Sequence, residues 1–196
     1  MTPLRFLSLT LAAVTLLATH CRASAADAAA GKALAEGCSG CHGADGISTT
    51  ALTPSLAGQP DEFIQWQLVY FRSGVRKNEI MGPMAQALSN EDIRNLGAYY
   101  ASLPPPKPSA PADAPAQQGE KLALQHRCKS CHSDDYNGFR AAARLSGQRE
   151  DVLLKALRDF KAGTRVGSGV ASMADVTFEL TDADMQTLAR YMASRP

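Results

Sequence analysis

The chain has 196 residues, of which 45% are hydrophobic and 20% charged, and its formal net charge is +1. A chain of this length forms one ordinary domain or two small ones. The charge excludes the strongly basic surface of a nucleic-acid-binding protein, and no stretch reaches the roughly 18 apolar residues that cross a bilayer as a helix. The sequence contains five cysteines, so one thiol is left over however the other four are used.

Residues 1–26 have the layout of a secretory signal peptide. Arg5 precedes an uncharged apolar stretch over 6–18, which is followed by small residues at 23–26. We expect cleavage after Ala25 or one residue later, which makes the mature protein periplasmic. The fifth cysteine, Cys21, leaves with this leader; the alternative, a lipid-anchor cysteine, is disfavoured because His20 stands where a small residue is needed.

A Pro-rich segment divides the rest of the chain into two similar halves. We interpret 104–117 as an extended, partly stiff linker. It separates an N-terminal domain over 27–103 from a C-terminal domain over 118–196. The pentapeptide C-S-G-C-H at 38–42 corresponds to C-K-S-C-H at 128–132, and L-A-G-Q at 56–59 corresponds to L-S-G-Q at 145–148. Matches in this order indicate a duplicated module.

Each module is predicted to be all-α. Ser89 and Thr181 are each followed three residues later by aspartate, a pattern that caps the first turn of a helix. We expect the final helix of each module behind these caps. A central helix is predicted over about 61–72, and its counterpart is predicted to contain Val152, Leu153, Leu157 and Phe160. Gly74 and Gly163 occupy the C-cap positions of these two helices, and no useful strand pattern is present.

Three uses of the four remaining cysteines compete. A zinc site built from two C-x-x-C pairs has them roughly 15 to 20 residues apart, whereas about 86 residues separate Cys41 from Cys128. A redox C-x-x-C follows a strand in a βαβ unit, which is not predicted here. The third use, C-x-x-C-H, is the attachment site of c-type haem. Two such motifs in register behind a secretory leader favour two haem c groups strongly over the alternatives.

This chemistry assigns roles to residues in each module. Thioether bonds are expected at Cys38 and Cys41, and at Cys128 and Cys131, with His42 and His132 as the proximal iron ligands. The covalently held porphyrin then supplies the apolar core that so small a module lacks.

Methionines decide whether the second axial position is closed. Met81 and Met173 each lie eight residues before a helix cap, so the repeat selects the same position twice. We expect both to ligate iron, and we expect Met84, Met185 and Met192 to fill the core. A thioether opposite an imidazole raises the reduction potential and leaves no open coordination position. Such iron passes electrons and does not easily bind a substrate.

The motifs CSGCHGADG, PSLAGQ, FRSGVRKNEIMGPMAQALS and CKSCHS, with the Pro-rich join, resemble the di-haem cytochrome c4 family over the whole mature chain. The resemblance implies two cytochrome c folds related by a pseudo-twofold axis, with haem propionates facing each other across the domain interface. It implies the same attachment and axial residues as above. The family also places a proline carbonyl on the proximal histidine: Pro54 fits, whereas Ala143 keeps the carbonyl without the rigidity.

We therefore expect a periplasmic electron-transfer protein, not an enzyme, with redox partners such as a cytochrome bc complex, a haem-copper terminal oxidase or a dehydrogenase. Peripheral association with the membrane stays open. One alternative is the cytochrome subunit of a sulfur-compound or alcohol dehydrogenase; another, a di-haem peroxidase, needs an open iron site. Equivalent basic clusters are either solvated or paired with haem propionates. They comprise Arg72, Arg76 and Lys77, and Arg158, Lys161 and Arg165.

Overall fold

The computed structural model describes residues 25–108, 115–166 and 171–196, so most of the expected signal peptide lies outside the described residues. These residues form helices, with a single isolated bridge between Phe139 and Ala142. In chain order the elements are α1 (Ala28–Ala35), η1 (Glu36–Cys38), α2 (Ser39–His42), α3 (Asp61–Arg72), α4 (Met81–Gln86), α5 (Asn90–Ser102), α6 (Pro115–Gln125), α7 (Lys129–His132), α8 (Glu150–Lys161), α9 (Ala171–Phe178) and α10 (Asp182–Ala193). The all-α prediction is confirmed.

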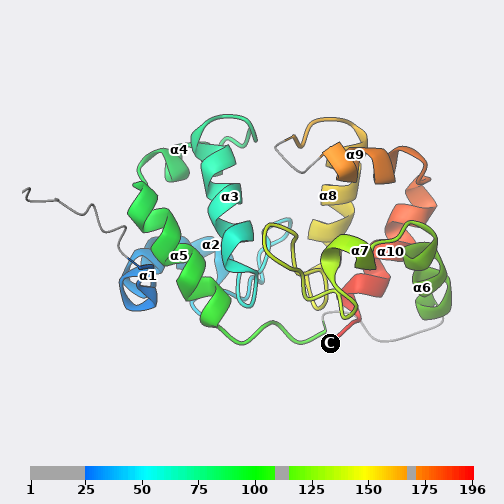
Figure 1. The fold of residues 1–196 in the computed structure, drawn as a ribbon, viewed down its shortest axis with the longest axis horizontal. Helices are drawn as coiled ribbons and strands as arrows, with labels where there is room; N and C mark the ends of the chain where they lie inside the picture. Colours follow the sequence, from blue (N-terminus) through cyan, green and yellow to red (C-terminus); the bar gives the residue numbers. More distant parts are fainter. Residues whose placement is uncertain (1–24, 109–114, 167–170) are drawn as a thin grey trace, which may run out of the picture.

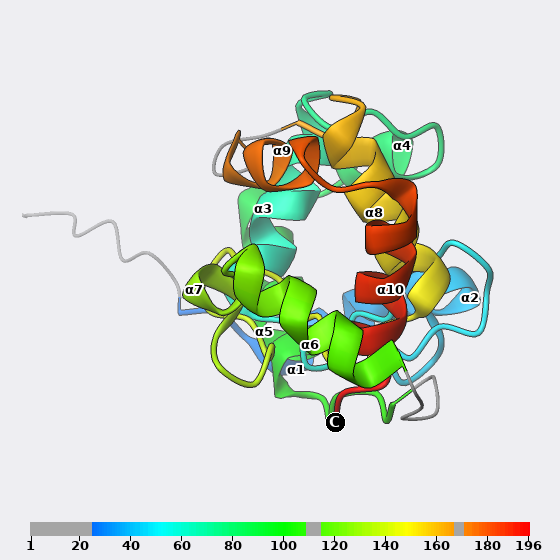
Figure 2. The same cartoon turned by 90° about the vertical axis from the view of Figure 1, so that its right-hand side faces the viewer.

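The helices repeat as two sets of five, which lie side by side in Figure 1. The helices α1 to α5 form the N-terminal module, and α6 to α10 form the C-terminal module in the same order. The central helices α3 and α8 face each other across the middle of the molecule, and α4 and α9 lie at the same end. Figure 2, turned by 90°, keeps α4 and α9 together at the top.

The sequence predicted the central and final helices for the reasons seen in the structure. Ser89 and Thr181 each form a capping box, in which the hydroxyl accepts from the backbone N–H of the aspartate three residues on and that carboxylate accepts from the cap N–H. After α3 and α8, Gly74 and Gly163 adopt φ values of +74° and +69°, the left-handed conformation that ends helices at low cost in glycine.

The first helix of each module was not predicted individually, and glycine sets its position. A Cβ added to Gly31 of α1 would overlap the backbone of Asn95 in α5, and one added to Gly119 of α6 would overlap Tyr191 in α10. The absence of a side chain therefore lets the first and last helices of each module cross in close contact. Asp27 caps α1 by accepting from the backbone N–H of Ala29 and Ala30.

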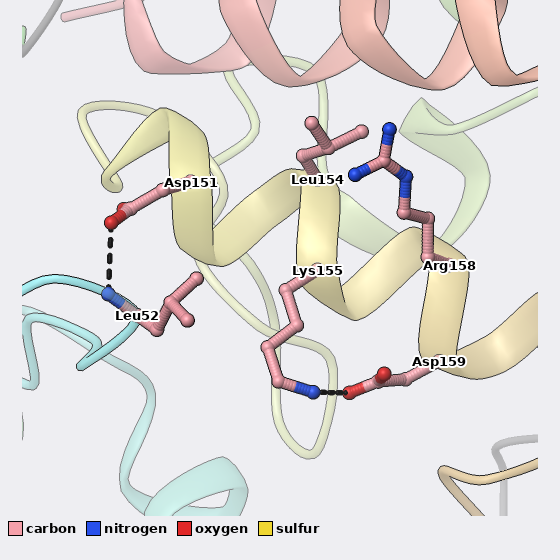
Figure 3. A pocket seen from close by; sticks show the side chains of 6 residues that line it. All are labelled: Leu52, Asp151, Leu154, Lys155, Arg158 and Asp159. Atoms are coloured by element: carbon pink, nitrogen blue, oxygen red, sulfur yellow. Dashed lines mark hydrogen bonds and ion pairs between the residues drawn. The ribbon is translucent and has the colours of Figure 1, made fainter.

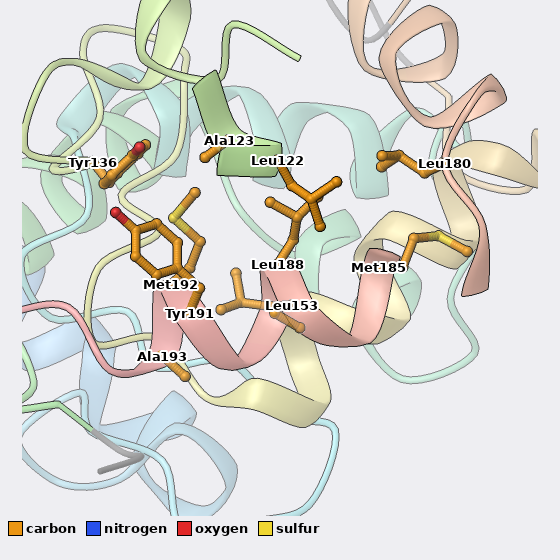
Figure 4. Close-up of a cluster of buried hydrophobic side chains, with 11 residues drawn as sticks. Leu122, Ala123, Tyr136, Leu153, Leu180, Met185, Leu188, Tyr191, Met192 and Ala193 are labelled. Carbon is orange, nitrogen blue, oxygen red and sulfur yellow. The ribbon is translucent and has the colours of Figure 1, made fainter. Parts of the chain in front are cut away.

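Each module has its own hydrophobic cluster. In the C-terminal module the buried members of the cluster come from α6, α8 and α10 and from the loop residues Tyr136 and Leu180 (Figure 4). In the N-terminal module the buried members of the cluster are Ala35, Ile64, Leu96 and Tyr100, surrounded by half-buried apolar side chains that include Phe63 and Leu68. This cluster has four buried members, and that of the C-terminal module has eleven. Modules of this size gain stability from a large bound apolar group.

The linker prediction needs one correction at its C-terminal end. The helix α6 begins at Pro115, within the segment 104–117 that was expected to be extended. Proline is tolerated at the first position of a helix because its missing N–H has no partner there in any helix. The described part of the linker packs against both halves: the main chain of Pro105 lies against Gly58, and that of Pro106 lies against Gly147.

Polar contacts join the modules directly. The backbone N–H of Leu52 donates to Oδ2 of Asp151 at 2.8 Å, beside a pocket of about 390 Å³ (Figure 3). Arg149 donates to the carbonyl oxygen of Ser48 at 3.3 Å. Among the residues that the structure covers, no helix is long and apolar enough to cross a membrane.

Candidate functional site: two equivalent Cys-Cys-His segments

The two C-x-x-C-H motifs adopt the same local structure. In the N-terminal module, the 3₁₀ turn η1 ends at Cys38 and α2 ends at His42. In the C-terminal module, α7 begins immediately after Cys128 and ends at His132. One helical turn therefore brings two cysteines and a histidine together in each module, as the motif requires.

Both histidine rings are buried and fixed by the backbone. His42 and His132 are 7% and 9% exposed. Nδ1 of His42 lies 2.8 Å from the carbonyl oxygen of Pro54, and Nδ1 of His132 lies 2.7 Å from that of Ala143. Since a carbonyl accepts only, Nδ1 carries the proton and Nε2 keeps its lone pair for a metal. The expectation that Ala143 supplies the same carbonyl as Pro54 is confirmed.

Burial also sets the charge state of these groups. It lowers the pKa of His42 and His132, with the backbone hydrogen bond acting in the opposite direction, so the neutral imidazole is favoured. Burial raises the pKa of the Cys38 and Cys128 thiols. Neutral imidazole is the form of histidine that binds iron.

No disulfide joins the described cysteines of the two motifs. Cys38 and Cys128 are half-buried, whereas Cys41 and Cys131 are exposed. Each half-buried thiol packs against its module's hydrophobic cluster, next to the equivalent residues Leu56 and Leu145. A flat apolar group attached through these sulfurs would find apolar side chains beside its point of attachment. The donor set and its apolar surroundings fit haem.

The two methionines selected by the repeat lie at equivalent places. Met81 begins α4 and Met173 lies in the first turn of α9, and both are half-buried. In Figures 1 and 2, α4 and α9 lie at the top of the view, across their modules from α2 and α7. Met185 and Met192 are buried in the C-terminal core, as expected, but Met84 is 47% exposed, so its expected role in the core is wrong.

The basic clusters separate into two kinds. Arg76 and Arg165 are half-buried, and each guanidinium lies 4.5 Å from a ring centroid, that of Phe71 and that of Phe160. The other members serve local structure or solvent: Arg158 is exposed and pairs with Asp182, and Lys161 donates to carbonyl oxygens near the end of α9. Arg72 donates to the carbonyl oxygen of Leu88, and Lys77 is exposed.

The sequence reasoning missed the role of the L-x-G-Q glutamines, which served only to align the two halves. Gln59 and Gln148 are 4% and 5% exposed, and each binds the backbone of the other module. Their recurrence in both halves, as polar residues beside apolar ones, was the available signal.

Comparison with known proteins agrees with this geometry. The Cytochrome c family matches the chain twice, over residues 28–104 and 116–196. A thiosulfate dehydrogenase electron acceptor from Thiomonas intermedia is 36% identical over 95% of this chain and 90% of its own length. Cytochrome c4 from Pseudomonas aeruginosa is 32% identical over 91% of this chain and 94% of its own length.

Solved structures show the same two-module architecture. Reduced cytochrome c4 from Pseudomonas stutzeri superposes with a TM-score of 0.80 at 31% identity, covering 88% of this chain and all of that one. Thiosulfate dehydrogenase from Marichromatium purpuratum gives a TM-score of 0.76 at 32% identity, covering 86% of this chain and 40% of that one. The chain thus belongs to the cytochrome c family, as a two-domain electron-transfer protein of the cytochrome c4 type that binds two haem c groups.

Proposed function

We propose that this protein is a periplasmic carrier of single electrons whose two haems are both closed to substrates. The attachment residues in this proposal are Cys38, Cys41, Cys128 and Cys131, and the axial residues are His42, Met81, His132 and Met173. Haem iron, when bound, accepts and releases one electron by changing between the ferric and ferrous states. The observation that carries the proposal is the pair of buried imidazoles, each with Nδ1 at hydrogen-bonding distance from the equivalent backbone carbonyl.

The chain's own residues supply binding and orientation. The carbonyl oxygens of Pro54 and Ala143 hold each imidazole in the tautomer and ring orientation that leave Nε2 available. The half-buried guanidiniums of Arg76 and Arg165 are suited to the propionate groups, because a carboxylate offsets the cost of burying a cation. With both axial positions occupied as proposed, neither iron has a coordination position free for a substrate, which supports a carrier over an enzyme.

The periplasmic location is supported by the layout of residues 1–26. A cut after Ala25 or Ala26 would leave α1 with its cap, because Asp27 is the N-cap residue of this helix. N-terminal sequencing of the protein exported by a Gram-negative host tests the location. A new N-terminus at residue 26 or 27 supports it, and a retained residue 1 in the cytoplasm contradicts it.

The partners are proposed by class. A respiratory donor such as a cytochrome bc complex and a haem-copper terminal oxidase are the pair that we favour. A second candidate donor is a dehydrogenase that oxidises sulfur compounds, and the observation in its favour is the 36% identity over almost the whole chain to the Thiomonas thiosulfate dehydrogenase electron acceptor. Both candidates use the protein as a carrier, so they differ in the donor.

Stopped-flow reduction of the oxidised protein distinguishes these donors. The protein is mixed in separate experiments with a reduced bc complex and with a thiosulfate dehydrogenase plus thiosulfate, and the haem absorbance is followed. Rapid uptake of two electrons per chain from the bc complex, passed on to a terminal oxidase, supports the favoured pair. Rapid uptake only from the dehydrogenase moves the function to sulfur oxidation, and turnover of peroxide by the protein alone contradicts the carrier role.

A further inference from the structure

The two modules are joined by a reciprocal pair of glutamine contacts. Gln148 donates from Nε2 to the carbonyl oxygen of Ser55 at 2.8 Å and accepts at Oε1 from the N–H of Ser55 at 3.0 Å. Gln59 does the same with Arg144, at 3.0 Å for both bonds. Ser55 and Arg144 are equivalent positions of the repeat, as are the two glutamines. Each module therefore offers the same amide to the same backbone residue of the other.

The peptide groups bound by the glutamines are those that bind the histidines. The peptide group between Pro54 and Ser55 accepts from Nδ1 of His42 at its oxygen and donates to Gln148 at its nitrogen. The peptide group between Ala143 and Arg144 accepts from His132 and donates to Gln59 in the same way. A continuous hydrogen-bonded chain thus runs from each proximal imidazole, through one peptide group, to a side chain of the opposite module.

Such a chain has an electronic consequence. In a buried site, hydrogen bonds in series strengthen one another, by about 10–30% per bond. An amide N–H that donates to glutamine makes its own carbonyl a better acceptor, which draws the Nδ1 proton further from the ring. The imidazole then becomes a more basic ligand, and a more basic ligand favours the ferric state. Loss of the glutamine should therefore raise the reduction potential of the haem on the other side of the interface.

We propose that Gln59 and Gln148 are positioning residues that tune the haem of the opposite module: Gln59 acts through Arg144 on His132, and Gln148 acts through Ser55 on His42. The inference rests on the proposed axial role of the two histidines. The two branches are not identical, because Oε1 of Gln148 also accepts from the N–H of Arg149 at 3.0 Å. A shared acceptor binds each donor more weakly, so the branch from Gln59 to His132 is the stronger of the two.

The test compares two matched variants, Gln59→Leu and Gln148→Leu, each the control for the other. Each removes two hydrogen bonds to the backbone of the other module and leaves the net charge unchanged, and Gln148→Leu also removes the acceptor of the Arg149 N–H. The potential of each haem is measured separately by redox titration followed by NMR of the hyperfine-shifted haem-methyl signals. Gln59→Leu should favour reduction of the C-terminal haem about threefold, equivalent to about 28 mV, and leave the N-terminal haem unchanged. Gln148→Leu should raise the reduction potential of the N-terminal haem alone, and by a smaller amount than Gln59→Leu raises that of the C-terminal haem.

A structural role alone gives a different pattern. If the glutamines only hold the modules together, either variant shifts both haems alike, and that result overturns the proposal, as does a shift confined to the haem of the altered module. If a leucine variant does not fold, Gln59→Asn and Gln148→Asn keep a polar side chain that is shorter by one methylene. Each should then raise the reduction potential of the haem in the opposite module only (the crossed pattern), by a smaller amount than the leucine variant. No shift in folded asparagine variants that have lost the contact also overturns the proposal.

The unsubstituted protein tests the underlying ligand assignment independently. The ring protons of His42 and His132 should both be hyperfine-shifted in the oxidised protein. If they are not, the proposed axial ligation fails. If they are shifted and the crossed pattern is absent, only the inference about the glutamines fails.

Discussion

Arg76 and Arg165, from opposite modules, donate to the same side-chain oxygen. Nη1 of Arg76 lies 2.6 Å and Nη2 of Arg165 lies 3.1 Å from Oε1 of Gln67. The two arginines occupy equivalent positions, each after its central helix, so Gln67 lies where the symmetry-related cations approach each other. One neutral amide oxygen cannot offset two half-buried positive charges.

The charges are correspondingly destabilised. Burial lowers the pKa of Arg76 to about 10, partly offset by Asp159. Burial, and then the nearby charge of Arg76, lowers the pKa of Arg165 to about 9. Within the described residues, neither guanidinium forms an ion pair with a carboxylate. The arrangement therefore calls for an anion, and the haem propionates implied at this interface by the family resemblance fit that need.

Replacing one of these cations should lower a haem potential. Arg76→Gln removes positive charge that disfavours the ferric state, and we expect a fall on the order of tens of millivolts, because about 1 kcal/mol of electrostatic energy corresponds to roughly 40 mV for one electron. Redox titration measures it. Lys77→Gln removes the same charge from an exposed neighbour and should have a much smaller effect; equal shifts in the two variants would show that Arg76 has no special role.

The choice of axial methionine is tested by a second pair of variants. Met81→Ala should convert one of the two haems to the high-spin state, because the thioether is lost and a weak ligand or none remains. Met84→Ala should leave both haems low-spin, because that side chain is 47% exposed. Electronic absorption and EPR spectra of the oxidised proteins report the spin state. The reverse outcome would assign ligation to Met84.

The sequence predicted those parts of the fold that depend on local chemistry. The capping boxes at Ser89 and Thr181, the central helix over 61–72 and the glycine that ends it are all determined by neighbouring residues. The attachment motifs were equally readable, because two thiols and an imidazole at fixed spacing have few other uses. The repeat then allowed each assignment in one module to be checked at the equivalent position of the other.

What the sequence did not reveal depends on contacts between distant residues. The crossing of α1 and α5 at Gly31 joins residues more than 60 positions apart, and nothing near Gly31 indicates it. The glutamine contacts likewise join the two modules, about 90 positions apart. Arg76 and Arg165 could be listed as basic, but only the packing of Phe71 and Phe160 separates them from the solvated cations around them.

The helix crossing predicts a strong effect from a small substitution. Gly31→Ala should destabilise the protein by roughly 1–3 kcal/mol, because the added methyl group overlaps the backbone of Asn95 and one helix must move. Gly37→Ala is the control, since nothing lies within 4 Å of an added Cβ there. Denaturant unfolding followed by circular dichroism measures both. Equal stability of the two variants would mean that α1 and α5 are not in close contact at Gly31.

The second capping box predicts a pH-dependent stability. Hydrogen bonds from the Thr181 hydroxyl and backbone N–H lower the pKa of Asp184 below its ordinary value of 3.8. The unfolded chain is therefore protonated first as the pH falls, so the contribution of this carboxylate is complete above about pH 4 and is lost at lower pH. Asp184→Asn should lower the free energy of unfolding by on the order of 0.5 kcal/mol at pH 7. The difference in unfolding free energy between this variant and the unsubstituted protein should disappear towards pH 3.

Thr181→Ala provides the comparison. It removes a hydroxyl that accepts from the Asp184 N–H at 3.1 Å, whatever the charge of the carboxylate. Thr181→Ala should lower the free energy of unfolding by about 1 kcal/mol, and most of this loss should remain at pH 3. A cost of Asp184→Asn that is the same at both pH values would show that the carboxylate charge does not stabilise α10.

A closed electron carrier has two haems with no accessible coordination position, and exposure of the fully reduced protein to carbon monoxide tests this most directly. Absorbance in the Soret region is recorded before and after mixing, with anaerobic Met81→Ala as the positive control. The unsubstituted protein should show no change at either haem, whereas the variant should bind the gas at one. Prompt binding to the unsubstituted protein would contradict the closed-carrier account and indicate an open site at which chemistry can occur.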